Sequence, residues 1–144
     1  MEQRVNLITL GVADLSRARA FYEGLGWEGQ EVEETVFFQA GGLAVVLWGR
    51  EKLATDCGVL DEPVDRFGNV VLAHNVRSEG EVEDIVQAAR DAGATVTRPP
   101  GKTFYGGYAA CFADLDGHVW EVAHNPGFTL SEDGALTVPD FTRP

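Results

Sequence analysis

The sequence predicts an α+β fold in which two βαβββ modules form a curled mixed sheet around a cleft. The first observation is that the order strand, helix and three strands occurs twice, in about residues 4–49 and again in about residues 68–124. The second is that each module has only one helix, which covers one face of its sheet and leaves the other bare. Two bare faces that curl towards each other would enclose a cleft.

In the first module, residues 5–12 are rich in β-branched and aliphatic side chains, which is typical of a strand. Asp14 then stands where a helix N-cap is expected, and apolar residues at helical spacing predict a helix over 14–25. Gly24 and Gly26 end it. Three further strands are predicted, over residues 27–33, 35–40 and 43–48.

The second module repeats this order. A strand over 69–76 leads to Ser78 and Glu81, the capping box that opens a helix ended by Gly93. A short strand over 95–98 is expected to stop at Pro99-Pro100-Gly101. Two last strands, over 108–113 and 119–124, flank a turn made of Asp and Gly. We expect one domain over 1–144, with a linker over about 50–67 and an irregular tail over 125–144 packed on a sheet edge.

Composition limits the function. The net charge of −12 opposes binding to nucleic acid or to an anionic membrane surface, which need clustered Lys and Arg. Cys57 and Cys111 stand far apart, without the spacing of a zinc or disulfide motif. No apolar run is long enough to span a membrane, and the first residues lack the apolar core of a signal peptide. We therefore expect a cytoplasmic protein with reduced thiols.

Five short motifs carry a resemblance to a known family. They are Val12-Ala13-Asp14-Leu15, Ala20-Phe21-Tyr22, Leu25-Gly26-Trp27, Phe112-Ala113-Asp114-Leu115-Asp116-Gly117-His118 and Trp120-Glu121-Val122. Together they resemble the glyoxalase, bleomycin-resistance and extradiol-dioxygenase group, the vicinal oxygen chelate superfamily. The resemblance implies the paired-module fold and frequent homodimers. It leaves the activity open, because this family includes lyases, isomerases, dioxygenases, thiol transferases and drug binders.

The resemblance also implies where a divalent ion would bind. Carried onto this sequence, the family's ligand positions are Leu7, Val46 or a neighbour, Asn69 and Glu121. Leucine and valine cannot ligate a metal, and an asparagine offers only a weak neutral oxygen. We therefore expect no metal and no cofactor.

The run after the Asp-Gly turn carries one carboxylate, Glu121, among apolar residues. If Glu121 faces the cleft, strand alternation sends Trp120 and Val122 to the helix side. Glu121 is then either a structural acid bonded to backbone amides or Asn69, or a contact for a ligand. The aromatic loop 102–108 either covers the cleft or plugs the barrel end. The predicted ligand-binding residues are Trp48, Asn69, Tyr105, Tyr108 and Glu121.

These features favour a metal-independent small-molecule binding protein that sequesters an aromatic or cationic compound such as a drug or metabolite, and that forms a homodimer. An alternative is a lyase, isomerase or dioxygenase of the same superfamily with an atypical metal site. A further alternative is an interaction module whose cleft is filled. The sequence assigns no catalytic residue.

Overall fold

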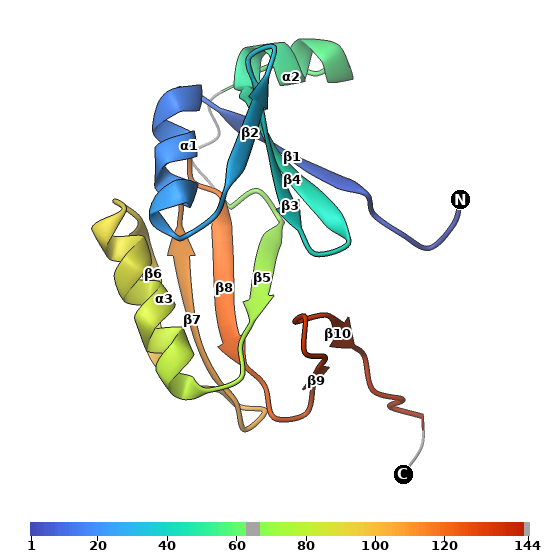
Figure 1. The fold of residues 1–144 in the computed structure, drawn as a ribbon, viewed down its shortest axis with the longest axis vertical. Helices are drawn as coiled ribbons and strands as arrows, with labels where there is room; N and C mark the ends of the chain where they lie inside the picture. Colours follow the sequence, from blue (N-terminus) through green and yellow to red (C-terminus); the bar gives the residue numbers. More distant parts are fainter. Residues whose placement is uncertain (63–66, 143–144) are drawn as a thin grey trace.

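A computed structural model describes residues 1–62 and 67–142 of the chain and confirms the predicted fold class (Figure 1). The first module contains β1 (Leu7–Val12), α1 (Leu15–Gly24), β2 (Gly29–Val32), β3 (Thr35–Ala40) and β4 (Leu43–Gly49). After α2 (Arg50–Cys57), the second module contains β5 (Val71–Asn75), α3 (Glu79–Asp91), β6 (Thr95–Lys102), β7 (Tyr108–Ala113) and β8 (Val119–His124). The tail forms β9 (Thr129–Leu130) and β10 (Leu136–Thr137).

The two modules have the same topology. The strands of the first sheet lie in the order β1-β4-β3-β2, and those of the second in the order β5-β8-β7-β6. In each sheet the first and last strands of the module, β1 with β4 and β5 with β8, pair in parallel, and the other pairs are antiparallel. The predicted repeat of element order is therefore a repeat of sheet architecture.

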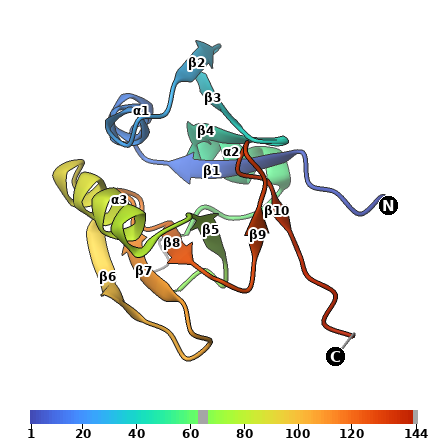
Figure 2. The ribbon, with the colours of Figure 1, turned by 60° about the horizontal axis from the view of Figure 1, so that its bottom comes forward.

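The two helices that were predicted, α1 and α3, start where expected. Asp14 caps α1 by accepting a hydrogen bond from the backbone N–H of Arg17, and Ser78 caps α3 by accepting one from Glu81. The two helices lie side by side on one side of the molecule, while β9 and β10 lie on the other side (Figures 1 and 2). The helix faces of both sheets share one hydrophobic core. Its largest fully buried side chains are Tyr22, Phe38, Phe112, Leu47, Val12, Val36, Val82, Val86 and Val122.

The structure corrects several predicted elements and boundaries. The tail, which was expected to be irregular, forms the antiparallel pair β9–β10. The expected linker over 50–67, of which residues 63–66 lie outside the described residues, carries the helix α2. The residues of α2 are largely exposed and give little amphipathic signal. The strand β6 does not stop at the prolines but continues through them to Lys102. The strand β5 begins at Val71, so Asn69 precedes it. Prolines are tolerated in β6 because it is an edge strand, where a missing N–H faces away from its neighbour.

None of the helices in the described part of the chain is long and apolar enough to cross a membrane.

Candidate functional site

The Asp-Gly turn between β7 and β8 is organised by a buried carboxylate. One oxygen of Asp114 accepts hydrogen bonds from the backbone N–H groups of Asp116 and His118, at 2.9 and 2.8 Å. The other contacts the Nδ1 atom of His118 at 2.7 Å and accepts a 2.6 Å hydrogen bond from the Tyr22 hydroxyl. Burial alone would raise the pKa of Asp114, but the hydrogen bonds from His118 and Tyr22 outweigh it and lower the pKa.

This turn joins the two modules. Tyr22 lies on α1 of the first module, and its hydroxyl also accepts a hydrogen bond from the Trp120 indole at 3.2 Å. Asp116 accepts a 2.8 Å hydrogen bond from the backbone N–H of Ala13, at the entrance to α1. Burial and the charge of Asp114 raise the pKa of Tyr22 well above its usual range. The turn therefore has a structural role between the modules, which its sequence pattern alone did not reveal.

Side chains along β8 alternate between the two faces of the sheet as predicted. Trp120 and Val122 belong to the hydrophobic core, so Glu121 lies on the opposite face. In register with it, one row of side chains crosses the second sheet on that face: Ala73 on β5, Glu121 on β8, Cys111 on β7 and Arg98 on β6. We call the face of the second sheet that carries this row the open face.

Arg98 is the partner of Glu121. Its Nη2 atom lies 3.4 Å from the Glu121 carboxylate, and the two side chains are 48% and 33% exposed. Cys111 lies between them, and partial burial raises the pKa of its thiol, against the opposing effect of the Arg98 charge. The predicted partners of Glu121 were backbone amides or Asn69. The Arg98 guanidinium was missed because the predicted strand ended at Arg98. Its pairing with Cys111 on the next strand was therefore not predicted.

Two register shifts flank Arg98 in β6, and the first sets the face on which it lies. Along β6, Val96 pairs with Phe112 and Arg98 with the adjacent Cys111, so β6 has one residue more than β7 in this interval. In a regular strand, Val96 and Arg98 would lie on the same face. The bulge lets Val96 pack against the core while Arg98 lies on the open face. A second register shift follows between Arg98 and Gly101.

The structure does not gather the other predicted ligand-binding residues around Glu121. Asn69 is exposed, precedes β5 and adopts a left-handed conformation with φ of 62°. The β5 residue paired with Glu121 is Ala73, four positions later. Trp48 lies at the end of β4 and lines a wide surface pocket of about 470 Å³ with α2 residues Glu51, Lys52, Thr55 and Asp56.

The two predicted tyrosines of the β6–β7 hairpin have different surroundings. Tyr108 packs against the core on the helix side, and its hydroxyl donates a hydrogen bond to Glu83 on α3. Tyr105, in the loop, is 40% exposed and contacts the Phe104 ring edge-on. Tyr108 is therefore held against the core and α3, whereas Tyr105 has exposed ring surface that a ligand could contact.

The donor set does not fit the metal site implied by the resemblance. Leu7 on β1 pairs with Ala44, which lies two residues before Val46 on β4. In the same way, Val71 on β5 pairs with Val119, which lies two residues before Glu121 on β8. The repeat of the modules therefore makes Val71, rather than Asn69, the counterpart of Leu7. Three of the four positions are aliphatic and cannot ligate. Within residues 1–62 and 67–142, no group of three or more His, Cys, Asp or Glu side chains could hold a metal ion.

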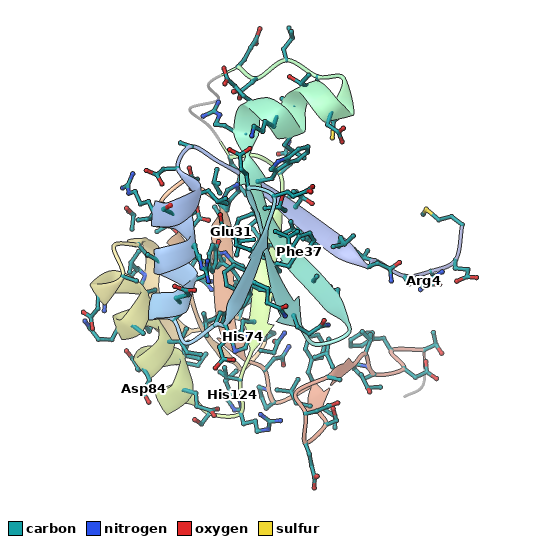
Figure 3. All side chains as sticks on the ribbon, turned by 45° about the horizontal axis from the view of Figure 1, so that its top comes forward. Arg4, Glu31, Phe37, His74, Asp84 and His124 are labelled. Atoms are coloured by element: carbon teal, nitrogen blue, oxygen red, sulfur yellow. The ribbon has the colours of Figure 1, made fainter. Side chains whose placement is uncertain are left out.

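A small cavity of about 70 Å³ lies on the other face of the second sheet, where the modules meet. Burial lowers the pKa of His74, which lies at this cavity. His74, which is labelled in Figure 3, belongs to β5. The lining residues are Tyr22, Leu25, Trp27, His74, Ile85, Phe112, Trp120 and Val122. The polar atoms of Tyr22 and Trp120 bond to each other and to Asp114, so they offer no free group to a ligand.

The family model of the Glyoxalase/Bleomycin resistance protein/Dioxygenase superfamily matches residues 4–122. The chain belongs to this superfamily. Members of the glyoxalase superfamily with solved structures share its fold. A glyoxalase-related enzyme from Fulvimarina pelagi is 38% identical, with a TM-score of 0.88, and the alignment covers 96% of this chain and 100% of that one. No curated protein matches the chain.

Two other solved structures are less similar to the chain. A hypothetical protein from S. aureus is 26% identical over 86% of this chain and 94% of its own, with a TM-score of 0.76. The fosfomycin resistance protein FosX from Mesorhizobium loti is 19% identical over 87% of this chain and 93% of its own, with a TM-score of 0.64. At that identity, the similarity to FosX concerns the fold alone.

Proposed function

We propose that this glyoxalase-superfamily chain is a metal-independent small-molecule binding protein, which holds its ligand on the open face beside Glu121 and sequesters it. The observation that carries the proposal is the residue content of the family's ligand positions. Glu121 is the one carboxylate there, and Leu7, Val46 and Val71 are aliphatic residues in place of ligands. Leu7 and Val71 are exposed, whereas Val46 is buried. Binding through apolar contact and a few polar groups needs no metal.

The surroundings of Glu121 support this proposal. Residues beside the charged row on the open face are small or aliphatic: Val71, Val119, Ala109, Ala113 and Ala123. Ala109 and Ala123 are buried, so Val71, Val119 and Ala113 are the ones that a ligand could contact. Some of this surface is accessible, since Val71 is 45% exposed. Tyr105 adds an exposed ring on the neighbouring hairpin. Trp48 remains a candidate through its own pocket, whereas Tyr108 and Asn69 are given no part.

The proposal is tested by screening aromatic amines, aromatic acids and neutral aromatics for an increase in melting temperature, with products analysed by mass spectrometry. We expect saturable binding without turnover, unaffected by a chelator and weakened several-fold by Glu121→Gln. Glu83→Gln, on the helix side, is the matched control. Product formation that requires a divalent ion would instead support the alternative, a lyase, isomerase or dioxygenase with an atypical metal site. A full set without any binding would refute the proposal.

We also propose that the protein is a cytoplasmic homodimer without nucleic-acid or membrane partners. The net charge of −12 supports the absence of polyanionic partners, and two free thiols are compatible with a reducing compartment. Exposed apolar side chains on the sheets, such as Leu7 at 56%, support a second copy. Light scattering across a concentration series should give twice the chain mass, and a monomer at all concentrations would contradict the dimer.

A further inference from the structure

We infer that Arg98 and Glu121 form a two-point receptor for a zwitterion, a small amino carboxylate with an apolar body. Arg98 would bind its carboxylate, and Glu121 would bind its ammonium group. This inference rests on the proposed function and specifies its ligand class. The sequence-based expectation of an aromatic or cationic ligand considered the Glu121 carboxylate alone. The Arg98 guanidinium beside it changes the expected ligand from a cation to a zwitterion.

The position of Arg98 is the first argument. A regular β6 would turn this side chain to the same face as Val96, towards α3. The bulge between them turns it to the open face instead, and a second register shift follows directly. Bulges of this kind often lie next to functional sites, where they redirect a side chain. A guanidinium that a register shift places beside Glu121, on the face that also carries Val71 and Val119, indicates a binding group.

The weakness of the ion pair is the second argument. Its shortest contact is 3.4 Å, longer than the 2.7–2.9 Å typical of charge-assisted hydrogen bonds. Both partners are substantially exposed, and exposed pairs of this kind contribute little to stability. A ligand can therefore open the pair at little cost. The guanidinium has a planar fork of donors suited to a carboxylate, and Glu121 offers acceptors for an ammonium group.

The charge balance selects the zwitterion. A ligand with only a carboxylate would take Arg98 and leave Glu121 without its partner, and a ligand with only an ammonium group would do the reverse. A zwitterion replaces both halves of the pair at once. Cys111 adds no charge between them, because its thiol pKa is raised. Ala73, on the other side of Glu121, is small and leaves room for the ligand, whose apolar body would lie on the adjacent Val71 and Val119.

The experiment compares three series of probes by isothermal titration calorimetry. Each series contains a free amino acid (phenylalanine, leucine or tryptophan), its amide, which keeps only the ammonium group, and its deamino acid, which keeps only the carboxylate. We expect the amino acid of at least one series to bind wild type roughly tenfold tighter than both relatives, a difference of about 1.4 kcal/mol. Arg98→Gln should abolish the preference over the amide, and Glu121→Gln the preference over the deamino acid.

Arg90→Gln, which removes an exposed arginine from α3, is the matched control and should retain both preferences. Circular dichroism of each variant separates a lost site from a lost fold. If no zwitterion exceeds both relatives, or if Arg98→Gln leaves the preferences unchanged, the inference is wrong while the proposed function stands. If neither these probes nor the aromatic compounds bind, the proposed function fails as well.

Discussion

The Tyr22 hydroxyl links two groups, Asp114 and Trp120, in the buried region where the modules meet. It donates to Asp114 at 2.6 Å and accepts from the Trp120 indole at 3.2 Å, so its loss would leave both neighbours with one partner fewer. Buried groups left unpaired cost about 1–3 kcal/mol each. We expect Tyr22→Phe to lower the free energy of unfolding by about 1–3 kcal/mol in urea titrations. Tyr105→Phe, on the exposed loop, is the control and should change it by less than about 0.5 kcal/mol.

His118 gives the turn a dependence on pH. Burial by itself would lower the pKa of His118, but its hydrogen bond to Asp114 and the charges of Asp114 and Asp116 outweigh this and raise it. Of the two cations on α2, Arg50 pairs with Asp61 and also interacts with Asp116, and Lys52 pairs with Glu34. The folded protein therefore holds the His118 proton more tightly than the unfolded chain. This contribution to stability is complete below about pH 6.5, the unfolded pKa, and is lost as pH rises through the folded pKa.

The prediction is that His118→Gln destabilises the protein more at pH 6 than at pH 8.5, measured by urea unfolding. His74 supplies the opposite sign, since burial lowers its pKa and its neutral form is favoured in the folded protein. Its contribution is present above the unfolded pKa and is lost as pH falls through the folded pKa. His74→Gln should therefore remove part of the stability loss in acid. Equal effects of His118→Gln at both pH values would contradict this account.

Among the elements, the β6–β7 hairpin depends on one close backbone approach. A Cβ on Gly107 would lie 2.7 Å from the carbonyl oxygen of His124 and 2.5 Å from the Tyr105 ring. We expect Gly107→Ala to cost about 1–3 kcal/mol of stability, as overpacked positions do. Gly101→Ala lies in the same hairpin, where the nearest heavy atom is 4.0 Å away, and should be nearly neutral. Thermal unfolding monitored by circular dichroism measures both, and equal effects would disprove the steric explanation.

The same hairpin shows what local sequence patterns can and cannot predict. Caps such as Asp14 and Ser78 act within one turn of a helix, so they fixed both helix starts. The alternation of side chains along β8 depends only on adjacent residues, so it correctly placed Glu121 and Trp120 on opposite faces of the sheet. The position of Arg98 depends on its pairing with β7 across a bulge, and no pattern within β6 encodes that register. The ion pair between Arg98 and Glu121 could therefore be identified from the structure but not from the sequence.

The helix α2 was missed for a related reason. Its residues are mostly exposed and none is buried, so the periodic apolar stripe that identifies a helix is absent. It is ended by Gly58 in a left-handed conformation and packs against β1 at Gly11. A Cβ on Gly11 would lie 3.1 Å from the Cβ of Arg50. This contact joins distant parts of the chain and leaves no local signal.

The whole molecule is two repeats around one core. Side chains of both modules pack together, and the hydrogen bonds of Asp114 and Asp116 cross between them. Neither module can then unfold without exposing apolar surface of the other. We expect one cooperative unfolding transition, with coincident curves from tryptophan fluorescence and far-ultraviolet circular dichroism. Asp116→Ala, which removes the bond to Ala13, should shift both curves equally, and two separated transitions would contradict a shared core.

Cys111 also makes the open face accessible to chemical labelling. It is a partly exposed thiol in the row between Arg98 and Glu121, whereas Cys57 is exposed at the end of α2. The raised pKa of Cys111 slows its alkylation, because the thiolate is the reactive form. A ligand seated on the open face should slow it further and leave the alkylation of Cys57 unchanged. The native chain thus contains an occupancy reporter and its internal reference, readable by mass spectrometry without an attached dye.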